Sequence, residues 1–346
     1  MNRSLLFIIA LMSIAASCRK QEVGPQCPSC EGEFSSNVRE VVIGCEGNFG
    51  WGNASISVYN PENNAVSNQV FNNVNGFGVG DVLQSITLIN NELFVVVNNS
   101  NEIKVLDTSN YQINRILTCS GSPRNILKIN NSKAFVSDLY NDSIMILDYN
   151  SGQELGQIAT DRWVEKMYNI NGQVWALTPD TNFVFIVDPS IDQIVDTIVV
   201  GQSPNGIKID VNGKAWVLSS GGNQNELATL SRINPITRTI EATFTFNQLS
   251  DSPRLLDINA QRDALYFVNE DLYKMDISAS SLPSASITSS NGSIFYGMNL
   301  DTLSNEIYLT DAVDYVQPGK VFRIDENGIS LDTFTVGIIP QAIWFK

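Results

Sequence analysis

The residues of this chain that could do chemistry are mainly carboxylates, because it contains 36 aspartates and glutamates and no histidine. Without histidine, Ser-His-Asp and Cys-His nucleophiles and histidine-ligated zinc sites are excluded. Two acidic pairs, Asp138 with Asp142 and Asp311 with Asp314, fall in predicted loops where a glycosidase or a calcium-dependent lactonase could use them. In so acidic a chain we expect solvated loop carboxylates instead, and a protein that is not an enzyme and carries no cofactor or metal.

A more specific pattern lies at the start of the strand that is expected to open each repeat. Pro123, Pro204 and Pro253 each precede a polar residue there, and proline sets the bend without taking a donor from the sheet. Aligning these strands gives seven side chains that can hydrogen-bond: Gln84, Arg124, Glu165, Asn205, Arg254, Tyr296 and Gln341. We expect them to ring the mouth of a central channel, either as a ligand-binding surface or as groups that only solvate its rim.

Aromatic residues in loops rich in glycine and asparagine form a second candidate binding feature. Large aromatic side chains in such loops are not expected in a core, and they suit a broad, partly apolar partner. The aromatic residues assigned to the ligand site are Trp51, Tyr140, Trp163 and Tyr315, with Phe49 and Phe77 in the same or neighbouring loops. Together with the polar ring they predict a concave small-molecule site. By contrast, Trp175, Trp216 and Trp344 lie within predicted strands and are expected to pack between repeats.

These residues recur at fixed places in a repeated β-hairpin. The segment 133–148, KAFVSDLYNDSIMILD, alternates apolar and polar residues about a turn at 141–143, which is typical of a hairpin. Seven copies of this hairpin end at Asn60, Asp107, Asp148, Asp188, Asn234, Asp276 and Asp325, at intervals of 47, 41, 40, 46, 42 and 49 residues. A period of roughly 40–45 residues with several strands per repeat indicates a β-propeller.

The two ends of the repeat array predict how the ring closes. The first copy begins with its second strand at Val41, whereas the chain ends in a spare first strand, GIIPQAIWFK. We therefore expect an all-β fold, a seven-bladed β-propeller of four-stranded blades, whose C-terminal strand joins the first blade and removes an exposed edge. The segment 68–80 is expected to be a long connection between blades.

The residues before the repeats read as an export signal and a tether. Residues 1–17 contain a basic start and a twelve-residue apolar run, Leu5 to Ala16, too short to span a bilayer as a mature helix. Small residues precede Cys18 as in bacterial lipoprotein processing sites, so lipidation at Cys18 and a membrane anchor are expected. Residues 18–38 form the tether, in which Cys27 and Cys30 are expected to form a local disulfide; residues 39–346 form the propeller.

The formal charge of −15 argues against a nucleic-acid partner. An acidic chain with no basic stripe repels phosphate backbones and has no cluster of cations to displace their counterions.

Cys45 and Cys119 fall in predicted strands of different blades. We expect both to be buried apolar side chains that fill space in the core.

The repeated G-x-S-P-x-x-I, together with the N-x-I-x-V-x-D strand of residues 101–107, resembles the YncE-like, YVTN-type seven-bladed propellers over nearly all of 39–346. Among exported relatives the chain is most similar to the BtuG-like, cobalamin-binding surface lipoproteins of Bacteroidota. That resemblance implies an outer-membrane lipoprotein, lipid-anchored at the cell surface or at the periplasmic face, which binds a cobamide on its loop face and delivers it to a TonB-dependent transporter. Two alternatives remain open, a protein-interaction scaffold of the envelope and a carboxylate- or metal-dependent hydrolase.

Overall fold

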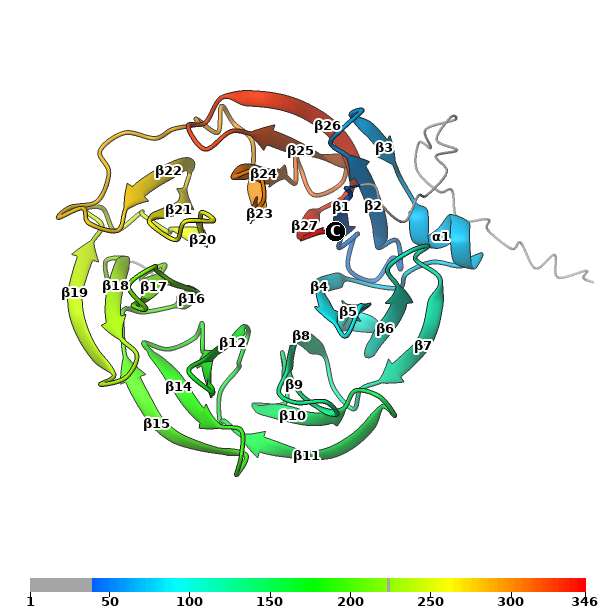
Figure 1. The fold of residues 1–346 in the computed structure, drawn as a ribbon, viewed down its shortest axis with the longest axis horizontal. Coiled ribbons are helices and arrows are strands. Elements are labelled where there is room, and N and C mark those ends of the chain that lie inside the picture. The colour runs from blue at the N-terminus through cyan, green and yellow to red at the C-terminus, as the bar shows by residue number, and fades with distance from the viewer. Residues whose placement is uncertain (1–38, 223–224) are drawn as a thin grey trace, which may run out of the picture.

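In a computed structural model, residues 39–222 and 225–346 form a closed ring of seven small antiparallel sheets (Figure 1). This confirms the predicted β-propeller. We use the word channel for the central axis of this ring. We number the blades 1 to 7 by the order of their second strands along the chain. The predicted signal sequence, the predicted tether, the predicted lipidation site Cys18 and the expected Cys27–Cys30 disulfide lie outside the described residues.

The innermost strand of each blade borders the channel (Figure 1). In order from blade 2, these strands are β4 (Leu83–Ile89), β8 (Pro123–Lys128), β12 (Met167–Ile170), β16 (Pro204–Ile209), β20 (Arg254–Ile258), β23 (Phe295–Asp301) and, in blade 1, β27 (Pro340–Phe345). The C-terminal β27 pairs antiparallel with the first strand of the chain, with Val42 opposite Trp344. The ring is therefore closed by its two ends, as the sequence predicted.

The repeated hairpin supplies the two middle strands of every blade. The second strands are β1 (Val41–Cys45), β5 (Glu92–Val97), β9 (Lys133–Asp138), β13 (Gln173–Leu177), β17 (Ala215–Ser219), β21 (Ala264–Asn269) and β24 (Glu306–Asp311). The third strands are β2 (Ser55–Asn60), β6 (Glu102–Asp107), β10 (Ser143–Asp148), β14 (Phe183–Asp188), β18 (Thr229–Asn234), β22 (Asp271–Asp276) and β25 (Pro318–Ile324). Strands β1 and β5 are buried along nearly their whole length, because each blade is covered on both faces by its neighbours.

The outer strands face solvent and complete six of the blades. They are β3 (Ala65–Ser67), β7 (Ile113–Thr118), β11 (Gln153–Ala159), β15 (Gln193–Val199), β19 (Thr239–Thr245) and β26 (Ser330–Ile338). Blade 6 departs from the prediction, because its sheet has only three strands. The segment after β22 makes one isolated bridge, Leu272 with Thr288, in place of a fourth strand. Polar and small residues in 278–293 leave it without the apolar alternation that a strand needs.

The long connection 68–80 is confirmed, and it contains the helix α1 (Val70–Asn75), which the sequence analysis did not predict. Val70 and Phe71 of this helix are buried against blades 1 and 2. A single 3-10 turn, η1 (Asn98–Ser100), follows β5. Within the described residues, no helix is long and apolar enough to cross a membrane.

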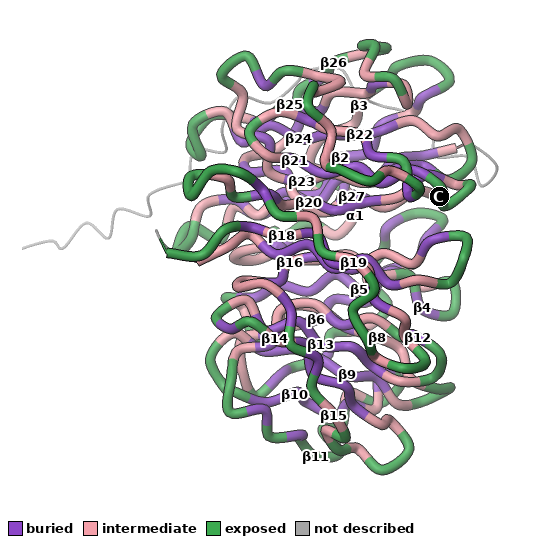
Figure 2. Tube along the Cα trace, turned by 90° about the vertical axis from the view of Figure 1, so that its left-hand side faces the viewer, coloured by how far each residue is buried: buried purple, intermediate pink, exposed green. Residues whose placement is uncertain are grey.

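The core lies between neighbouring blades. Figure 2 shows buried residues along the strands and exposed residues mainly in the loops at the two edges of the ring. One cluster joins Phe94 and Val105 of blade 2 to Val136 and Met145 of blade 3. The predicted packing role of the three strand tryptophans is confirmed, because Trp175 and Trp216 are buried between blades and Trp344 packs on the cluster beside β1. Cys45 and Cys119 are buried free thiols, as expected.

Candidate functional site

The start of each inner strand lies on one face of the ring, together with the loops between second and third strands. We call this the loop face. Inner and second strands are antiparallel neighbours, so the beginning of one meets the end of the other, as Pro123 opposite Asp138 illustrates. Each predicted ring residue lies in the first two positions of its inner strand, except Glu165, which lies just before β12. The seven ring residues, which hold equivalent positions in the sequence repeat, therefore all lie on the loop face.

A β-bulge accompanies the ring residue in most blades. Gln84, Asn205 and Gln341 each lack an opposite residue in the register of their sheet, and the register also shifts at Arg124 and Tyr296. A bulge leaves one residue outside the ladder and re-aims its side chain. The ring residues therefore lie at or beside interruptions of the ladder between inner and second strands.

Four of the seven ring residues interact with one another. Arg124 makes a bidentate ion pair with Glu165, with Nε 2.7 Å from Oε2 and Nη2 2.8 Å from Oε1. Gln84 donates through Nε2 to Oε1 of Glu165, at 3.5 Å, and to Oε1 of Gln341, at 3.4 Å. The two charged side chains are 16% and 14% exposed, so water screens this pair only partly. These contacts span blades 1 to 4 and form a connected polar network across the channel mouth.

Two other ring residues hold neighbouring blades together. The Nδ2 of Asn205 donates to the carbonyl oxygen of Pro253 at 2.9 Å, and Nη2 of Arg254 donates to the carbonyl oxygen of Phe295 at 2.9 Å. Each carbonyl belongs to the next blade at the start of its inner strand or one residue before it. Asn98 makes the corresponding bond to the carbonyl of Pro123, at 3.1 Å, from the end of a second strand. Asn205 and Arg254 thus contribute to ring closure through side-chain bonds between blades.

Glu46 is a member of the site that the sequence analysis missed. Its Oε2 accepts a hydrogen bond from the hydroxyl of Tyr296 at 3.1 Å. Burial raises its pKa from 4.5 to about 7 against the opposing effects of the Tyr296 hydrogen bond and the Arg124 charge, and the Glu165 charge raises it further. The channel mouth therefore holds two carboxylates, whereas the sequence predicted only Glu165. The signal in the sequence that could have identified Glu46 as a site residue is its position directly after a second strand.

Backbone strain helps to place Glu46. Its amide donates to the carbonyl of Ile339 at 2.9 Å, and Ile339 has a φ of 54°. Val82 and Val313 also have left-handed φ values, 63° and 57°, beside other inner strands or their loops. This conformation is unfavourable for β-branched residues and is typically retained where the surrounding structure requires it. All three positions border the loop face.

Exposed aromatic side chains gather on one side of the mouth, over blades 1, 2 and 7. We call Phe49, Trp51, Phe77, Tyr315 and Val316 the rim patch; they are 71%, 66%, 47%, 42% and 63% exposed. Their loops are tied together, because Nδ2 of Asn48 donates to the carbonyl of Tyr315 at 2.6 Å and the amide of Gly50 donates to Oδ2 of Asp81 at 2.8 Å. The Tyr315 ring meets the Tyr296 ring edge-on, with centroids 5.8 Å apart. The rim patch is therefore continuous with the polar ring.

The other two predicted aromatic residues lie elsewhere. Tyr140 is 73% exposed in the β9–β10 loop of blade 3, across blade 2 from Trp51. Trp163 is half-buried and donates its indole N–H to Oε2 of Glu165 at 3.1 Å, so it belongs to the polar network. Tyr140 is therefore separate from the rim patch.

The two acidic pairs differ from the solvated loop carboxylates that we expected. Asp142 and Asp314 are exposed, but Asp138 and Asp311 are only 2% and 4% exposed. Asp138 accepts two backbone N–H groups of its own loop, whereas Asp311 accepts one from its own loop and one from Ile294 before β23. The prediction was wrong for these two residues because a loop whose amides point inwards needs a buried acceptor. Among residues 39–222 and 225–346, no three acidic or cysteine side chains group as a metal site would require.

Two pockets lie away from the mouth. One, of about 300 Å³, opens between blades 2 and 3 near Asp138. The other, of about 450 Å³, lies at the opposite end of blades 1 and 2, beside Leu88, Thr108 and Trp344. Neither of these two pockets is lined by the polar ring or by the rim patch.

Comparison with known proteins places the chain in a family. The sequence profile of a domain of unknown function, DUF5074, matches residues 41–328, and the chain belongs to that family. No curated protein matches the chain.

Solved structures share the fold at low sequence identity. A quinonprotein alcohol dehydrogenase-like protein from Bacteroides thetaiotaomicron has a TM-score of 0.66 at 15% identity, over 88% of this chain and 77% of that one. Virginiamycin B lyase from Staphylococcus aureus has a TM-score of 0.61 at 14% identity, over 76% of this chain and 90% of that one. A computationally designed protein also matches, with a TM-score of 0.58 at 14% identity, over 91% of this chain and 89% of that one. At these identities the likeness concerns the fold alone.

Proposed function

We propose that this chain is a non-enzymatic, lipid-anchored envelope protein that binds a small molecule at the rim patch and the adjoining polar ring. The observation that carries the proposal is the concentration of exposed aromatic side chains beside hydrogen-bonding groups on one side of the channel mouth. Exposed aromatic surface is costly in water, and a grouped patch of this kind is typical of a binding surface.

The resemblance to YncE-like and BtuG-like proteins makes a cobamide the first ligand to test. A corrin ring offers a broad apolar face that Phe49, Trp51 and Tyr315 can contact. Its peripheral amides can exchange hydrogen bonds with Tyr296, Gln341 and Glu46. In this proposal the anchor follows from lipidation at Cys18, and the bound ligand passes to a TonB-dependent transporter of the outer membrane.

The test is a thermal-shift and calorimetric titration of the full-length chain with cobalamin, cobinamide, haem and calcium. We expect a rise in melting temperature with cobalamin, because a ligand that binds only the folded state stabilises it by mass action. Trp51→Ala should weaken binding by about 2 kcal/mol if this side chain is an anchor. The matched control is Ile236→Ala, since Ile236 is 83% exposed but lies in the β18–β19 turn on the opposite face.

Two results would contradict the proposal. Equal loss of affinity in the Trp51 and Ile236 variants would place the ligand elsewhere. The absence of binding to any of the four ligands would favour the scaffold alternative, in which the rim patch meets a protein, and a pull-down with envelope proteins would follow.

Glu46 favours a second candidate function, a reaction catalysed by carboxylates at the channel mouth. A carboxyl group whose pKa is raised to about 7 is suited to donate a proton near neutral pH, and Glu165 supplies a second carboxylate in the same mouth. The hydrolase alternative therefore has the two carboxylates that it requires. Hydrolysis of lactone or glycoside substrates that is lost in Glu46→Gln would support it.

A further inference from the structure

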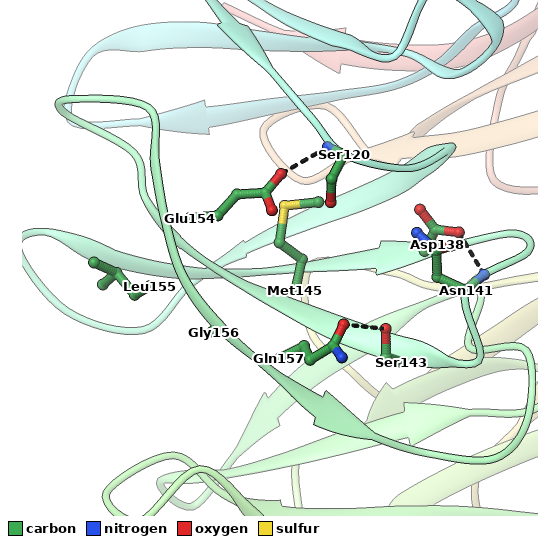
Figure 3. Close-up of a pocket in the computed structure, with 9 residues that line it drawn as sticks. All are labelled: Ser120, Asp138, Asn141, Ser143, Met145, Glu154, Leu155, Gly156 and Gln157. Atoms are coloured by element: carbon green, nitrogen blue, oxygen red, sulfur yellow. Dashed lines mark hydrogen bonds between the residues drawn. The ribbon is translucent and has the colours of Figure 1, made fainter.

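A second candidate site lies in the pocket between blades 2 and 3, away from the channel mouth (Figure 3). Its walls come from the turn after β7, the end of β9, the start of β10 and the middle of β11. None of the seven ring residues and none of the rim patch lines it. Its volume of about 300 Å³ is at the small end of ligand pockets.

Asp138 supplies a buried carboxylate oxygen without a partner in this pocket. Its Oδ1 accepts the amides of Tyr140 and Asn141, both at 2.8 Å, and so closes the β9–β10 loop. Its Oδ2 is buried and has no hydrogen-bond partner. In Figure 3 this second oxygen points away from the backbone N–H of Asn141, towards the side of the pocket where Ser120 lies. It lies against Gly121, where a Cβ would come within 2.0 Å of Oδ2 and 2.1 Å of the Asn141 Nδ2. An unpaired carboxylate oxygen is costly to bury, so a donor that reached it would be stabilising.

The loop itself does not need the second oxygen. Asp311 holds the equivalent position in blade 7, opposite Phe295 as Asp138 is opposite Pro123. There, Oδ1 alone accepts the amides of Ile294 and Val313, both at 2.8 Å. In both blades Oδ1 accepts two backbone amides, two from its own loop at Asp138 and one from its loop and one from the segment before β23 at Asp311, so Oδ2 of Asp138 is not needed for these bonds.

A second carboxylate faces the same pocket. Glu154 accepts the amide of Ser120 through Oε1 at 2.6 Å and is otherwise exposed (Figure 3). In the described part of the chain, neither Glu154 nor Asp138 forms an ion pair. The nearby Cys119 responds to this charge, because burial and then the charges of Glu154, Asp138 and Glu102 raise its pKa to about 12. The pocket is therefore negative and lacks a counter-charge.

The remaining lining decides what kind of cation would fit. Ser143 supplies a hydroxyl that lies 3.4 Å from Oε1 of Gln157, while Met145 and Leu155 supply apolar surface. In the described part of the chain, no three acidic or cysteine side chains group as a protein-built metal site would require. A primary ammonium group has three N–H donors and suits a site with several oxygen acceptors.

From these contacts we infer that the pocket binds a small primary amine. Its ammonium group would lie between Asp138 and Glu154, with donors to Oδ2 of Asp138 and to Ser143. Its aliphatic stem would lie along Met145 and Leu155. This site is independent of the channel mouth and of any ligand there.

The test is isothermal titration of the full-length chain with 1,4-diaminobutane, with 1,4-butanediol as an uncharged analogue of the same length. We expect saturable binding of the diamine and none of the diol. Asp138→Asn keeps the size and the oxygen that closes the loop but removes the charge, and it should weaken diamine binding roughly tenfold or more. Asp311→Asn is the matched control, because Asp311 has the same position in its blade but lines neither of the two pockets described, and this variant should bind as the wild type does.

Three outcomes would overturn the inference: no diamine binding by the wild type, equal binding of the diol, or diamine displaced by calcium at equimolar concentration. Unchanged affinity in Asp138→Asn would also overturn it. Should that variant fail to fold, Glu154→Gln replaces it, since Glu154 is exposed and its replacement leaves the β9–β10 loop intact. Unchanged affinity in Glu154→Gln would then refute the site.

Discussion

The raised pKa of Glu46 predicts that this protein loses stability as the pH rises through neutrality. Glu46 lies at the end of β1 under the rim patch, where burial opposes its ionisation. In the unfolded chain it ionises near 4.5, whereas in the folded chain it holds its proton to about pH 7. Between these values the folded state binds more protons than the unfolded state, so the free energy of unfolding falls with increasing pH. The contribution is fully present below about pH 4.5 and is lost above about pH 7.

The size of the effect follows from the same two values. The interval from 4.5 to about 7 corresponds to about 3 kcal/mol of unfolding free energy, which is an upper value because Glu46 is not fully buried. Glu46→Gln removes the ionisation but keeps an oxygen that can accept the Tyr296 hydroxyl. We therefore expect the variant to match the wild type near pH 4 and to exceed its stability by up to about 3 kcal/mol at pH 8.

Urea denaturation of both proteins from pH 4 to pH 8.5 measures this difference directly. Other carboxylates titrate in both proteins, so the difference between the two curves isolates Glu46. Glu62→Gln is the control, because Glu62 is exposed in the turn between β2 and β3 on the opposite face. A Glu46→Gln difference that is constant across the pH range would refute the reasoning, since it would reflect packing and not ionisation.

Two further predictions concern the ring. Arg124→Ala leaves Glu165 partly buried without its partner and should lower the free energy of unfolding, measured by urea denaturation, by about 2–3 kcal/mol. Arg238→Ala is the control, because it breaks a more exposed pair with Asp196 and should lower the free energy of unfolding by less than about 1 kcal/mol. Equal losses in the two variants would contradict the difference in burial between the pairs. Gly297→Ala would bring a Cβ to 2.3 Å from the backbone oxygen of Gln341 and should lower stability by about 2 kcal/mol, while Gly78→Ala, whose nearest neighbour is at 3.6 Å, should be nearly neutral. A neutral Gly297→Ala, measured by thermal melting, would mean that β23 and β27 approach less closely than described.

The sequence alone determined the architecture, because a propeller is built from local units. The hairpin of residues 133–148 is specified by its own alternation and turn, and repeating it about every 40–45 residues lets neighbouring blades in a ring bury both faces of each sheet. The missing first strand before Val41 and the spare strand at the end predicted the closure between β1 and β27. The repeat also located the ring residues, because their place in the repeat is fixed by the same strand.

What the ring residues do was decided by the tertiary structure. Gln84 and Asn205 look equivalent in the repeat, yet Gln84 joins the polar network and Asn205 bonds to the backbone of the next blade. The difference depends on which groups the neighbouring blades present across the channel, and the repeat of a single chain does not contain that information. The three-stranded blade 6 likewise reflects a local loss of apolar alternation that the average repeat conceals.

Glu46 and Asp138 show the same limit for single side chains. Glu46 directly follows a second strand and Asp138 is the last residue of one. Nothing in the sequence distinguishes these two acidic residues from Asp142, which is exposed. Only the folded ring buries Glu46 beside Tyr296 and leaves Oδ2 of Asp138 without a donor. Burial of a charge depends on atoms that come from distant segments of the chain, so the pKa of Glu46 and the free oxygen of Asp138 are properties of the tertiary structure.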